Sequence, residues 1–379
     1  MFCRTLCRLS LLLAAVAVAQ SSLADQPAAT AAKIDAKTYQ QTVDRAIQFL
    51  KNKQAPDGSF AAQAGPGVTA VVTTGLMRNG LSPDDPTVAK ALKYLQGFVQ
   101  ADGSVCAPKN MVQNYETSLA VVCFHEANGN HQYDALIKNA EKYLKSMQWG
   151  GDNQEGVDKS DPKYGGAGYG KHKRPDLSNT QFFLDALQAA GNGPDDPAVK
   201  RALVFVSRCQ NLETENNTTP MAAKNPDGGF YYTPAAGGIS DAGTTENGGL
   251  RSYGSMTYAG LKSMIYAGVK ADDPRVKAAI KWCQMHYGLD SNPGMGAAGL
   301  YYYYQTFAKA LAASGLTLVQ DDKGVKHDWR QDLLAALVSR QRPNGSWVNE
   351  DKHWYETEPS LVTGYALLSL AYCRPAGEK

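Results

Sequence analysis

Two kinds of helical segment alternate along the chain, and they differ in where their apolar residues lie. In the first kind one face is apolar: Tyr39, Val43, Ala46, Ile47 and Leu50 form a stripe beside Lys, Gln and Asp. This spacing predicts an amphipathic helix at the surface of the protein. Equivalent segments lie at residues 88–95, 137–144, 199–206 and 276–283.

Segments of the second kind are apolar on nearly every side. They lie at residues 68–77, 117–127, 178–190, 256–267, 303–313 and 360–372. A helix that is hydrophobic all round must be covered on every side. We therefore expect amphipathic helices in an outer layer and apolar helices in an inner layer, arranged as two concentric rings of an all-α protein.

This alternation divides the chain into six units, each with an outer and an inner helical half joined by a Gly-rich loop. The units are residues 39–86, 87–134, 135–197, 198–274, 275–328 and 329–375. A recurring unit of this size indicates a repeat architecture. We expect a single α/α toroid of six helical hairpins over residues 39–375, with a flexible leader at residues 25–38.

Three of the unit boundaries share an Asp–Pro pair, which begins at Asp85, Asp196 and Asp273. Asp is a favoured helix N-cap, and Pro fits the first turn of a helix. Because the pair recurs at a structural boundary, we interpret these acids as caps and not as catalytic or metal-binding groups. A glycine that can end the preceding inner helix comes before each pair. These glycines are Gly80, Gly191 and Gly268.

Glycine turns join the two halves of several units. The first, residues 57–60, reads Asp-Gly-Ser-Phe, and related turns lie at residues 102–105, 227–230 and 344–347. Asp or Asn followed by Gly is a strong turn signal. Units three and four carry long insertions at residues 149–176 and 211–251. Elaborated loops on a regular scaffold commonly carry binding residues, so we expect function to concentrate there.

The repeated residues resemble a known motif. Residues 45–60 place Arg-Ala, Phe-Leu, Gln, Gly and Phe at the spacing of the QW motif, the repeat of squalene–hopene cyclases and related terpenoid cyclases. Residues 201–210 match its first part and residues 341–347 its second. The resemblance implies the prenyltransferase/squalene-oxidase repeat superfamily, whose fold is an α/α toroid of six helical hairpins.

The chemistry of that superfamily is not visible in the sequence. Squalene–hopene cyclases protonate their substrate with an Asp-x-Asp-Asp motif, which this sequence lacks. Protein prenyltransferases bind zinc through Asp, Cys and His, and the corresponding stretches, residues 298–301 and 354–357, do not contain that ligand set. The resemblance therefore implies the fold, and we assign no metal, no cofactor and no catalytic residue from it.

The starts of the inner helices are expected to face the mouth of a central cavity. Five acids near these positions are candidates for catalysis: Glu116, Asp176, Glu246, Glu356 and Glu358. Carboxylates at helix N-termini also cap backbone amides and interact with the helix dipole, so a structural role stays open for each of them.

Aromatic residues near the same mouth are candidates for ligand binding. Ring faces can hold a hydrocarbon, stabilise a carbocation or stack against a sugar. Four consecutive tyrosines, residues 301–304, cannot all point one way on a helix, so some of them must be packing residues. The binding candidates are Tyr115, Arg251, Tyr253, Tyr301, Tyr304, Trp354 and Tyr355.

The net charge and the N-terminal sequence indicate which partners and which cellular location to expect. The net charge is +2 and no Lys/Arg-rich block occurs, so a nucleic-acid partner is not expected. Arg4 and Arg8 precede an apolar run at residues 9–19, and small residues follow up to Ala24. This pattern predicts a secretory signal peptide at residues 1–24, hence an exported protein without a transmembrane anchor.

Five cysteines follow the predicted signal peptide, enough for at most two disulfides, and their spacing does not suggest zinc. Three of them, Cys123, Cys283 and Cys373, lie among apolar helical residues, where we expect small buried side chains.

Three functions fit the sequence. The first is an exported squalene-cyclase/prenyltransferase-like protein whose aromatic-rich cavity binds or transforms a polyprenyl or triterpenoid lipid. The second is a non-catalytic binding or scaffold toroid. The third is a carbohydrate-active α/α barrel with two acids as acid and base. A cavity lined by aromatic and aliphatic residues favours the first, a cavity plugged by the insertions favours the second, and two carboxylates facing across an open groove favour the third.

Overall fold

A computed structural model describes residues 33–108, 111–151, 156–170 and 174–375 of the chain. These residues contain twelve α-helices, two short 3₁₀ helices and one two-stranded sheet. The predicted signal peptide and residues 25–32 of the predicted leader lie outside the described residues. In the described part of the chain, none of the helices has the length and apolar character needed to cross a membrane.

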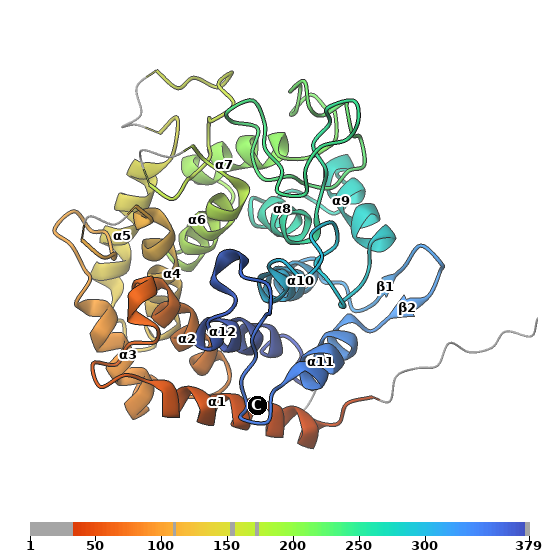
Figure 1. Ribbon diagram of the computed structural model, residues 1–379. Helices are drawn as coiled ribbons and strands as arrows, with labels where there is room; N and C mark the ends of the chain where they lie inside the picture. The colour runs from red at the N-terminus through yellow and green to blue at the C-terminus, as the bar shows by residue number, and fades with distance from the viewer. Residues whose placement is uncertain (1–32, 109–110, 152–155, 171–173, 376–379) are drawn as a thin grey trace, which may run out of the picture. The chain divides into compact units, whose positions relative to one another are not determined.

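Outer and inner helices alternate in chain order (Figure 1). The outer helices are α1 (Ala36–Lys53), α3 (Pro86–Gln96), α5 (Asp134–Met147), α7 (Pro197–Arg208), α9 (Pro274–Met285) and α11 (Trp329–Arg340). The inner helices are α2 (Pro66–Arg78), α4 (Gln113–Glu126), α6 (Leu177–Ala189), α8 (Gly254–Tyr266), α10 (Leu300–Ala313) and α12 (Pro359–Leu370). Smaller elements are η1 (Ala62–Ala64), η2 (His353–Tyr355), β1 (Val319–Gln320) and β2 (Lys326–His327).

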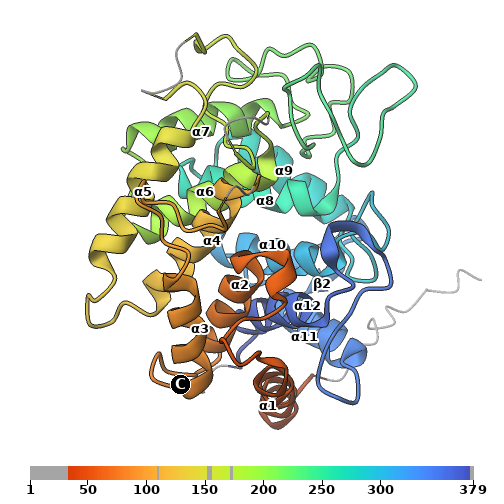
Figure 2. The same cartoon turned by 60° about the vertical axis from the view of Figure 1, so that its left-hand side comes forward.

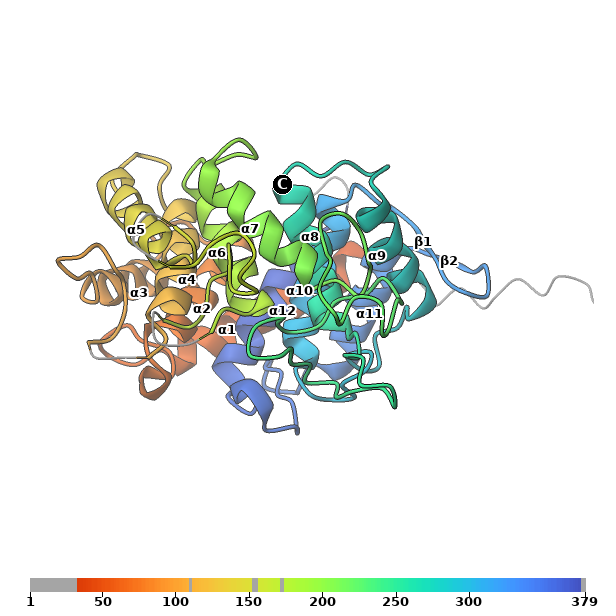
Figure 3. The ribbon, with the colours of Figure 1, turned by 90° about the horizontal axis from the view of Figure 1, so that it is seen from above.

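The inner helices form a closed ring. Each packs against the next in order from α2 to α12, and α12 packs against α2. The outer helices pack on the outside of this ring (Figure 2). The β1–β2 hairpin lies beside α11, outside the helical layers (Figure 3). The predicted all-α toroid of six hairpins in two concentric rings is therefore confirmed.

Burial follows the two hydrophobic patterns of the sequence. In α12 every residue from Ser360 to Leu370 is buried, and the same holds for α2 from Pro66 to Leu76. In α1, by contrast, the buried residues follow one face, with Tyr39, Val43, Ala46 and Leu50 among them. The apolar helices are inside because only that position covers all of their sides.

The predicted caps are confirmed at all three Asp–Pro boundaries. Asp85, Asp196 and Asp273 are the N-caps of α3, α7 and α9, and each side chain accepts a hydrogen bond from an amide of the first turn. Each following Pro occupies the first helical position. The glycines that end the preceding inner helices have left-handed backbone angles, with φ of 100° at Gly80.

The repeated Gln connects one unit to the next. The Gln54 side-chain amide donates to the Gly58 carbonyl of its own turn (3.0 Å) and to the Thr87 carbonyl of α3 (2.8 Å). Gln210 makes the same pair of bonds, to Gly228 (2.9 Å) and to Arg275 of α9 (2.8 Å). This glutamine therefore binds both the turn of its own unit and the outer helix of the next unit.

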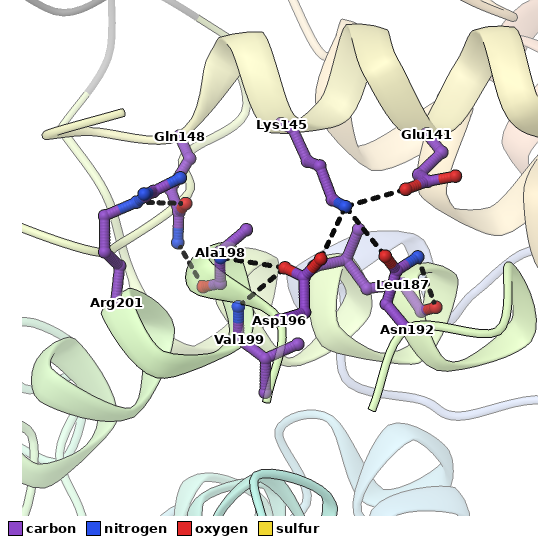
Figure 4. Close-up of polar contacts among 9 residues, drawn as sticks. All are labelled: Glu141, Lys145, Gln148, Leu187, Asn192, Asp196, Ala198, Val199 and Arg201. Atoms are coloured by element: carbon purple, nitrogen blue, oxygen red, sulfur yellow. Dashed lines mark hydrogen bonds and ion pairs between the residues drawn. The ribbon is translucent and has the colours of Figure 1, made fainter. Parts of the chain in front are cut away.

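Gln148 belongs to the same set, although the sequence did not reveal it (Figure 4). Its amide donates to the carbonyls of Gly165 (2.9 Å) and Ala198 (2.8 Å), while its side-chain oxygen accepts from Arg201 (3.0 Å). Nearby, the ammonium of Lys145 binds the capping Asp196 at 2.7 Å. Two side chains, Gln148 and Lys145, thus join the end of α5 to the start of α7 through three polar contacts.

Gln341 closes the ring. Its amide donates to the Gly345 carbonyl (3.0 Å) and to the Thr42 carbonyl of α1 (2.9 Å), and its side-chain oxygen accepts from Arg45. The last unit is thereby attached to the first by the contact that elsewhere joins consecutive units.

The Tyr-Glu-Thr sequence occurs twice near the start of an inner helix, at residues 115–117 and 355–357. Residues 115–117 lie inside α4, which begins at Gln113, whereas residues 355–357 come before an inner helix. Helix α12 begins at Pro359 with Glu358 as its N-cap. Tyr355 has a left-handed φ of 65°, which is incompatible with a continuing α-helix.

The cysteines that follow the predicted signal peptide are all buried and unpaired. The expectation of small buried side chains is confirmed for Cys123, Cys283 and Cys373. Burial raises the pKa of the Cys123 thiol to about 12. The disulfides that the sequence left open do not form.

Candidate functional site

The main candidate site is a cavity of about 330 Å³ at the N-terminal ends of the inner helices. Every inner helix contributes a side chain from its first half, for example Val68 of α2, Tyr115 of α4 and Tyr302 of α10. All six inner helices therefore point the same way around the cavity. The predicted mouth at the starts of these helices is the place where the cavity lies.

Aromatic side chains make up half of the cavity wall. From the inner helices, Tyr115 contacts Phe182 edge-on with ring centroids 5.3 Å apart, and Phe182 lies 5.9 Å from Tyr302. Tyr302 in turn lies 6.1 Å from Tyr365 of α12. These four rings form a continuous arc inside the helical ring.

The two insertions complete the wall of the cavity. Tyr169 comes from the first insertion, and Tyr232 and Asp241 come from the second. The hydroxyl of Tyr253, the N-cap residue of α8, donates to the Asp241 carboxylate at 3.1 Å. The described residues of the insertions line the cavity and do not fill it, so within them the condition that would favour a plugged scaffold is not met.

Asp176 lies one layer behind the wall. Its carboxylate caps α6 by accepting the Asn179 amide at 2.8 Å, and Tyr232 hydrogen-bonds to it from the cavity side. Burial raises the pKa of Asp176 to about 6, against the opposing effect of these hydrogen bonds and of Arg174. A carboxyl group that titrates near neutral pH thus contacts a tyrosine that lines the cavity.

Glu356 lines the cavity but is held by the protein itself. Its carboxylate accepts from the backbone amides of Tyr301 (3.2 Å) and Tyr302 (2.7 Å) and from the Asn349 side chain (2.8 Å). Burial raises the pKa of this group, while the same hydrogen bonds act to lower it. The acid fixes the loop before α12 to the start of α10.

The remaining acidic candidates do not line the cavity. Glu116 is buried and accepts from the Ala107 amide at 3.1 Å. Glu358 caps α12 through the Ser360 amide at 3.0 Å. Glu246 is exposed in the second insertion, eight residues before α8 begins. The structure therefore brings only Glu356 of the five candidate acids to the cavity surface.

The binding candidates divide in a similar way. Tyr115, Tyr253, Trp354 and Tyr355 line the cavity. Arg251 is exposed and donates to the Thr244 carbonyl at 2.9 Å, away from the aromatic wall.

Among the four consecutive tyrosines, it is Tyr302 that lines the cavity. Tyr304 donates to the Leu289 carbonyl, and Tyr301 is buried at the start of α10. Three further residues of the wall, Tyr169, Tyr232 and Asp241, lie in irregular loops. The sequence did not single out these three residues; it indicated only that the two insertions would carry binding residues.

The loop before α12 lies at the mouth of the cavity. Trp354 and Tyr355 both have left-handed backbone angles, with φ of 51° and 65°, and are 45% and 41% exposed. The Tyr355 hydroxyl accepts a hydrogen bond from Gln63 of η1 at 3.0 Å. Large aromatic residues seldom adopt this backbone conformation, so the surrounding contacts must hold this loop in place.

Comparisons with solved structures support the fold. The type II terpene cyclase MstE from Scytonema matches with a TM-score of 0.53 and 14% identity, covering 89% of this chain and 98% of the cyclase. A protein from Actinoplanes matches with a TM-score of 0.50 and 16% identity, over 88% of this chain and 99% of that one. The chain therefore has the α/α toroid fold of the type II terpene cyclase.

Two other solved structures match with TM-scores below 0.5. A variant of the same cyclase, in complex with its substrate geranylgeranyl dihydroxybenzoate, matches with a TM-score of 0.40 and 15% identity, over 89% of this chain and 98% of that one. An unsaturated glucuronyl hydrolase from Streptococcus agalactiae matches with a TM-score of 0.49 and 9% identity, covering 92% of this chain and 94% of that one. The sequence matches no protein-family model and no curated protein.

Proposed function

We propose that the cavity binds a compact isoprenoid-type hydrocarbon. The observation that carries this proposal is the composition of the wall. Of the eighteen residues that line the cavity, nine are aromatic, five are aliphatic and four are polar or acidic. Small-molecule sites are typically apolar with a few polar groups that fix the orientation of the ligand. Ring faces also suit a ligand that develops positive charge.

The polar groups of the wall are largely engaged within the protein. Ser178 hydrogen-bonds the Tyr302 hydroxyl at 2.9 Å, and Tyr253 donates to Asp241. Glu356 is bound by two backbone amides and Asn349. A sugar would require many free donors and acceptors, so these contacts favour a hydrocarbon over a carbohydrate.

The size of the cavity limits the ligand. Its volume of about 330 Å³ stands at the lower end of the range of about 300–1,000 Å³ for small-molecule pockets. A prenyl chain or a one- or two-ring terpenoid suits this volume better than a tetracyclic or pentacyclic triterpenoid. The shared fold with a type II terpene cyclase supports the same class of ligand.

A binding experiment tests the proposal. Quenching of intrinsic fluorescence would be titrated with farnesol, geranylgeraniol and squalene, and with cellobiose as the polar control. We expect saturable binding of the prenyl alcohols and none of cellobiose. Ser255→Trp should reduce binding at least tenfold because the larger side chain fills the cavity, whereas Ser160→Trp, at an exposed position of the first insertion, should not. Equal affinity of the two variants, or no prenyl binding, would refute the proposal.

A second candidate is acid-initiated conversion of the bound alkene. It is favoured by the carboxyl group of Asp241, which lies in the wall beside Tyr253. In its protonated form this group would give a proton to the alkene, and the resulting carboxylate would take a proton back from the carbocation as the product alkene forms. Incubation with prenyl lipids and product analysis would test it. If Asp241 supplies the proton, Asp241→Asn should retain prenyl binding and lose product formation. An Asp241→Asn variant as active as the parent would exclude this residue as the acid.

We further propose that the protein acts after export. The charged, apolar and small-residue segments of residues 4–24 support this proposal, although they lie outside the described residues. N-terminal sequencing of the protein from its own host tests it. A mature chain that begins near Asp25 is expected, and a chain that retains residues 1–24 would contradict it.

A further inference from the structure

A second, smaller cavity lies further along the axis of the ring. Its volume is about 30 Å³, and Phe182 and Tyr365 line both it and the aromatic cavity. The other residues around it come from the later turns of the inner helices, among them Asp185, Gln305 and Lys309. The two aromatic rings therefore separate an apolar chamber from a charged one.

The charged chamber contains a buried ion triad. Asp185 binds Lys262 at 2.6 Å through one oxygen and Lys309 at 2.8 Å through the other. The side chains of Asp185, Lys262 and Lys309 are only 4%, 1% and 9% exposed. Two cations share one anion, which leaves a formal charge of +1 in the interior. Uncompensated buried charge is costly, so this excess calls for a counter-charge.

The two lysines differ in their remaining hydrogen bonds. Lys262 also donates to the backbone carbonyl (3.3 Å) and the side-chain oxygen of Gln181, so each of its three protons has an acceptor. Within the described part of the chain, the ammonium of Lys309 has Asp185 as its one ion-pair or hydrogen-bond partner. The ring of Tyr266 lies near both lysines, 5.5 Å from Lys262 and 5.9 Å from Lys309.

A buried amide without a partner lines the same cavity. Gln305 is 5% exposed, and its side-chain oxygen has no hydrogen-bond partner among the described residues. Gln305 and Lys309 both line the chamber, so the Gln305 amide and the two unused protons of Lys309 lie around the same small space. The oxygen and nitrogen of a side-chain amide are assigned from their surroundings, and with its NH₂ group toward the chamber Gln305 adds hydrogen-bond donors to those of Lys309.

We propose that this chamber is a halide site, occupied by chloride between the ammonium of Lys309 and the amide of Gln305. The inference lies outside the aromatic cavity and does not depend on the proposed ligand of that cavity. A volume of about 30 Å³ holds about one or two water-sized groups, so a monoatomic ion fits and a carboxylate or phosphate group does not. Bound chloride would cancel the excess charge of the triad.

Other charged groups near the chamber are already paired. Arg78 lines the chamber, but it binds Glu126 at 2.7 Å, so that pair adds no net charge. Burial lowers the pKa of Lys262 to about 7. Loss of that proton at higher pH is the other way to remove the excess charge. Chloride should therefore bind most tightly below pH 7, where Lys262 keeps its proton.

Thermal unfolding of the full chain at pH 6 tests the proposal. Sodium chloride or bromide would replace sodium gluconate at constant ionic strength. We expect a saturable rise of about 2–8 °C in the unfolding midpoint, because a ligand of the folded state stabilises it by mass action. Crystals grown with bromide should show an anomalous peak beside Lys309. No midpoint shift together with no peak would overturn the proposal and assign the chamber to water.

A variant separates halide binding from a purely structural role. Lys309→Met leaves a neutral Asp185–Lys262 pair, so it should fold, lose the halide dependence and match or exceed the parent midpoint in gluconate. A purely structural salt bridge would instead make Lys309→Met less stable in every salt. Lys200→Met, which removes a lysine 60% exposed at the surface, should keep the full halide response. A halide response that persists in Lys309→Met would also refute the site.

Discussion

Glu356 receives hydrogen bonds from two amides of α10 although it precedes α12 in the chain. It therefore satisfies part of the free N-terminus of a neighbouring helix. Asp176 and Glu358 cap their own helices in the usual way. The concentration of acids around the cavity thus has a structural cause, because all inner helices begin there.

Removal of Glu356 should be costly. Glu356→Ala leaves the amides of Tyr301 and Tyr302 without their acceptor in a buried place, so we expect a loss of about 2–4 kcal/mol in the free energy of unfolding. Glu358→Ala removes one cap at a partly exposed position and should cost about 0.5–1 kcal/mol. Urea unfolding would measure both values. Equal losses would show that Glu356 is not an anchor between α10 and α12.

Asp176 should make stability depend on pH in a defined direction. Its pKa is about 6 in the folded protein and 3.8 in the reference state, so the folded state binds the proton more tightly. This group therefore opposes folding increasingly as pH rises from about 4 to about 6. Asp176→Asn removes that contribution, worth up to about 3 kcal/mol. Its stability relative to the parent should rise between pH 4 and pH 7, as measured by urea unfolding.

The Asp176 prediction has a clear control and a clear contradiction. Asp158→Asn changes a carboxyl group whose pKa is lowered by hydrogen bonds from Ser160. Its stability relative to the parent should not rise over this pH range. If the difference between Asp176→Asn and the parent stays constant from pH 4 to pH 7, Asp176 is not a titrating buried acid.

Single residues of the site were only partly predictable. Hydrophobic periodicity placed Tyr115 and Tyr253 near the mouth, and both line the cavity. The same reasoning preferred Tyr301 and Tyr304 over Tyr302, because rotation about a helix axis is set by packing against neighbours. Asp241 lies in an irregular loop without periodicity, and its approach to Tyr253 depends on the folded path of the insertion.

At the scale of elements, each glycine turn packs against the next outer helix. A Cβ atom at Gly58 would lie 2.4 Å from the Lys90 carbonyl oxygen of α3, and one at Gly345 would lie 2.3 Å from that of Arg45 in α1. The sequence predicted these turns from Asp-Gly and Asn-Gly. It did not reveal that the glycine is needed for contact between units, since a turn signal carries no information about the neighbour.

Two glycine substitutions separate backbone strain from close contact. Both Gly58 and Gly191 have positive φ, 92° and 87°, but a Cβ at Gly191 would meet no atom within 4 Å. Gly191→Ala should therefore cost about 1–2 kcal/mol, the strain of the left-handed backbone. Gly58→Ala should cost at least about 2 kcal/mol more, because α3 must also move. Urea unfolding measures the difference, and equal costs would show that the turn does not fix α3.

Only some of the Gln contacts between units could be predicted from the sequence. Gln54, Gln210 and Gln341 were recognisable by spacing within the motif. Gln148 was not, because the Gly165 carbonyl that it binds comes 17 residues later, inside the first insertion. The bond from each Gln to the following helix joins residues 33 to 65 positions apart in three of the units. Contacts of that range are determined by the ring and not by local pattern.

At the scale of the whole molecule, a closed ring differs from a linear stack of repeats because its last unit contacts its first. The sequence predicted the ring from the number of units and the resemblance to a toroidal superfamily. Packing of α12 on α2 and the bonds of Gln341 to α1 make that closure visible. In a linear array of repeats the end units have one neighbour each and are the least stable. In this ring every unit has two.

Closure can be tested with two chemically equivalent substitutions. Gln341→Leu removes the bonds from the last unit to Thr42, and Gln54→Leu removes the matching bonds from the first unit to Thr87. Each should cost about 1–3 kcal/mol because the two bonds donated by the side-chain amide are lost, and Gln341→Leu also removes the acceptor of Arg45. Only Gln341→Leu weakens the contact between the last and first units, so only this variant resembles a linear stack with two ends.

Amide hydrogen exchange in Gln341→Leu should therefore accelerate selectively in α1 and α11, while α5 and α7 stay protected. Gln54→Leu should instead accelerate exchange in α1 and α3. If both variants accelerate exchange uniformly over all outer helices, the ring opens as one cooperative unit and the closing contact has no special role.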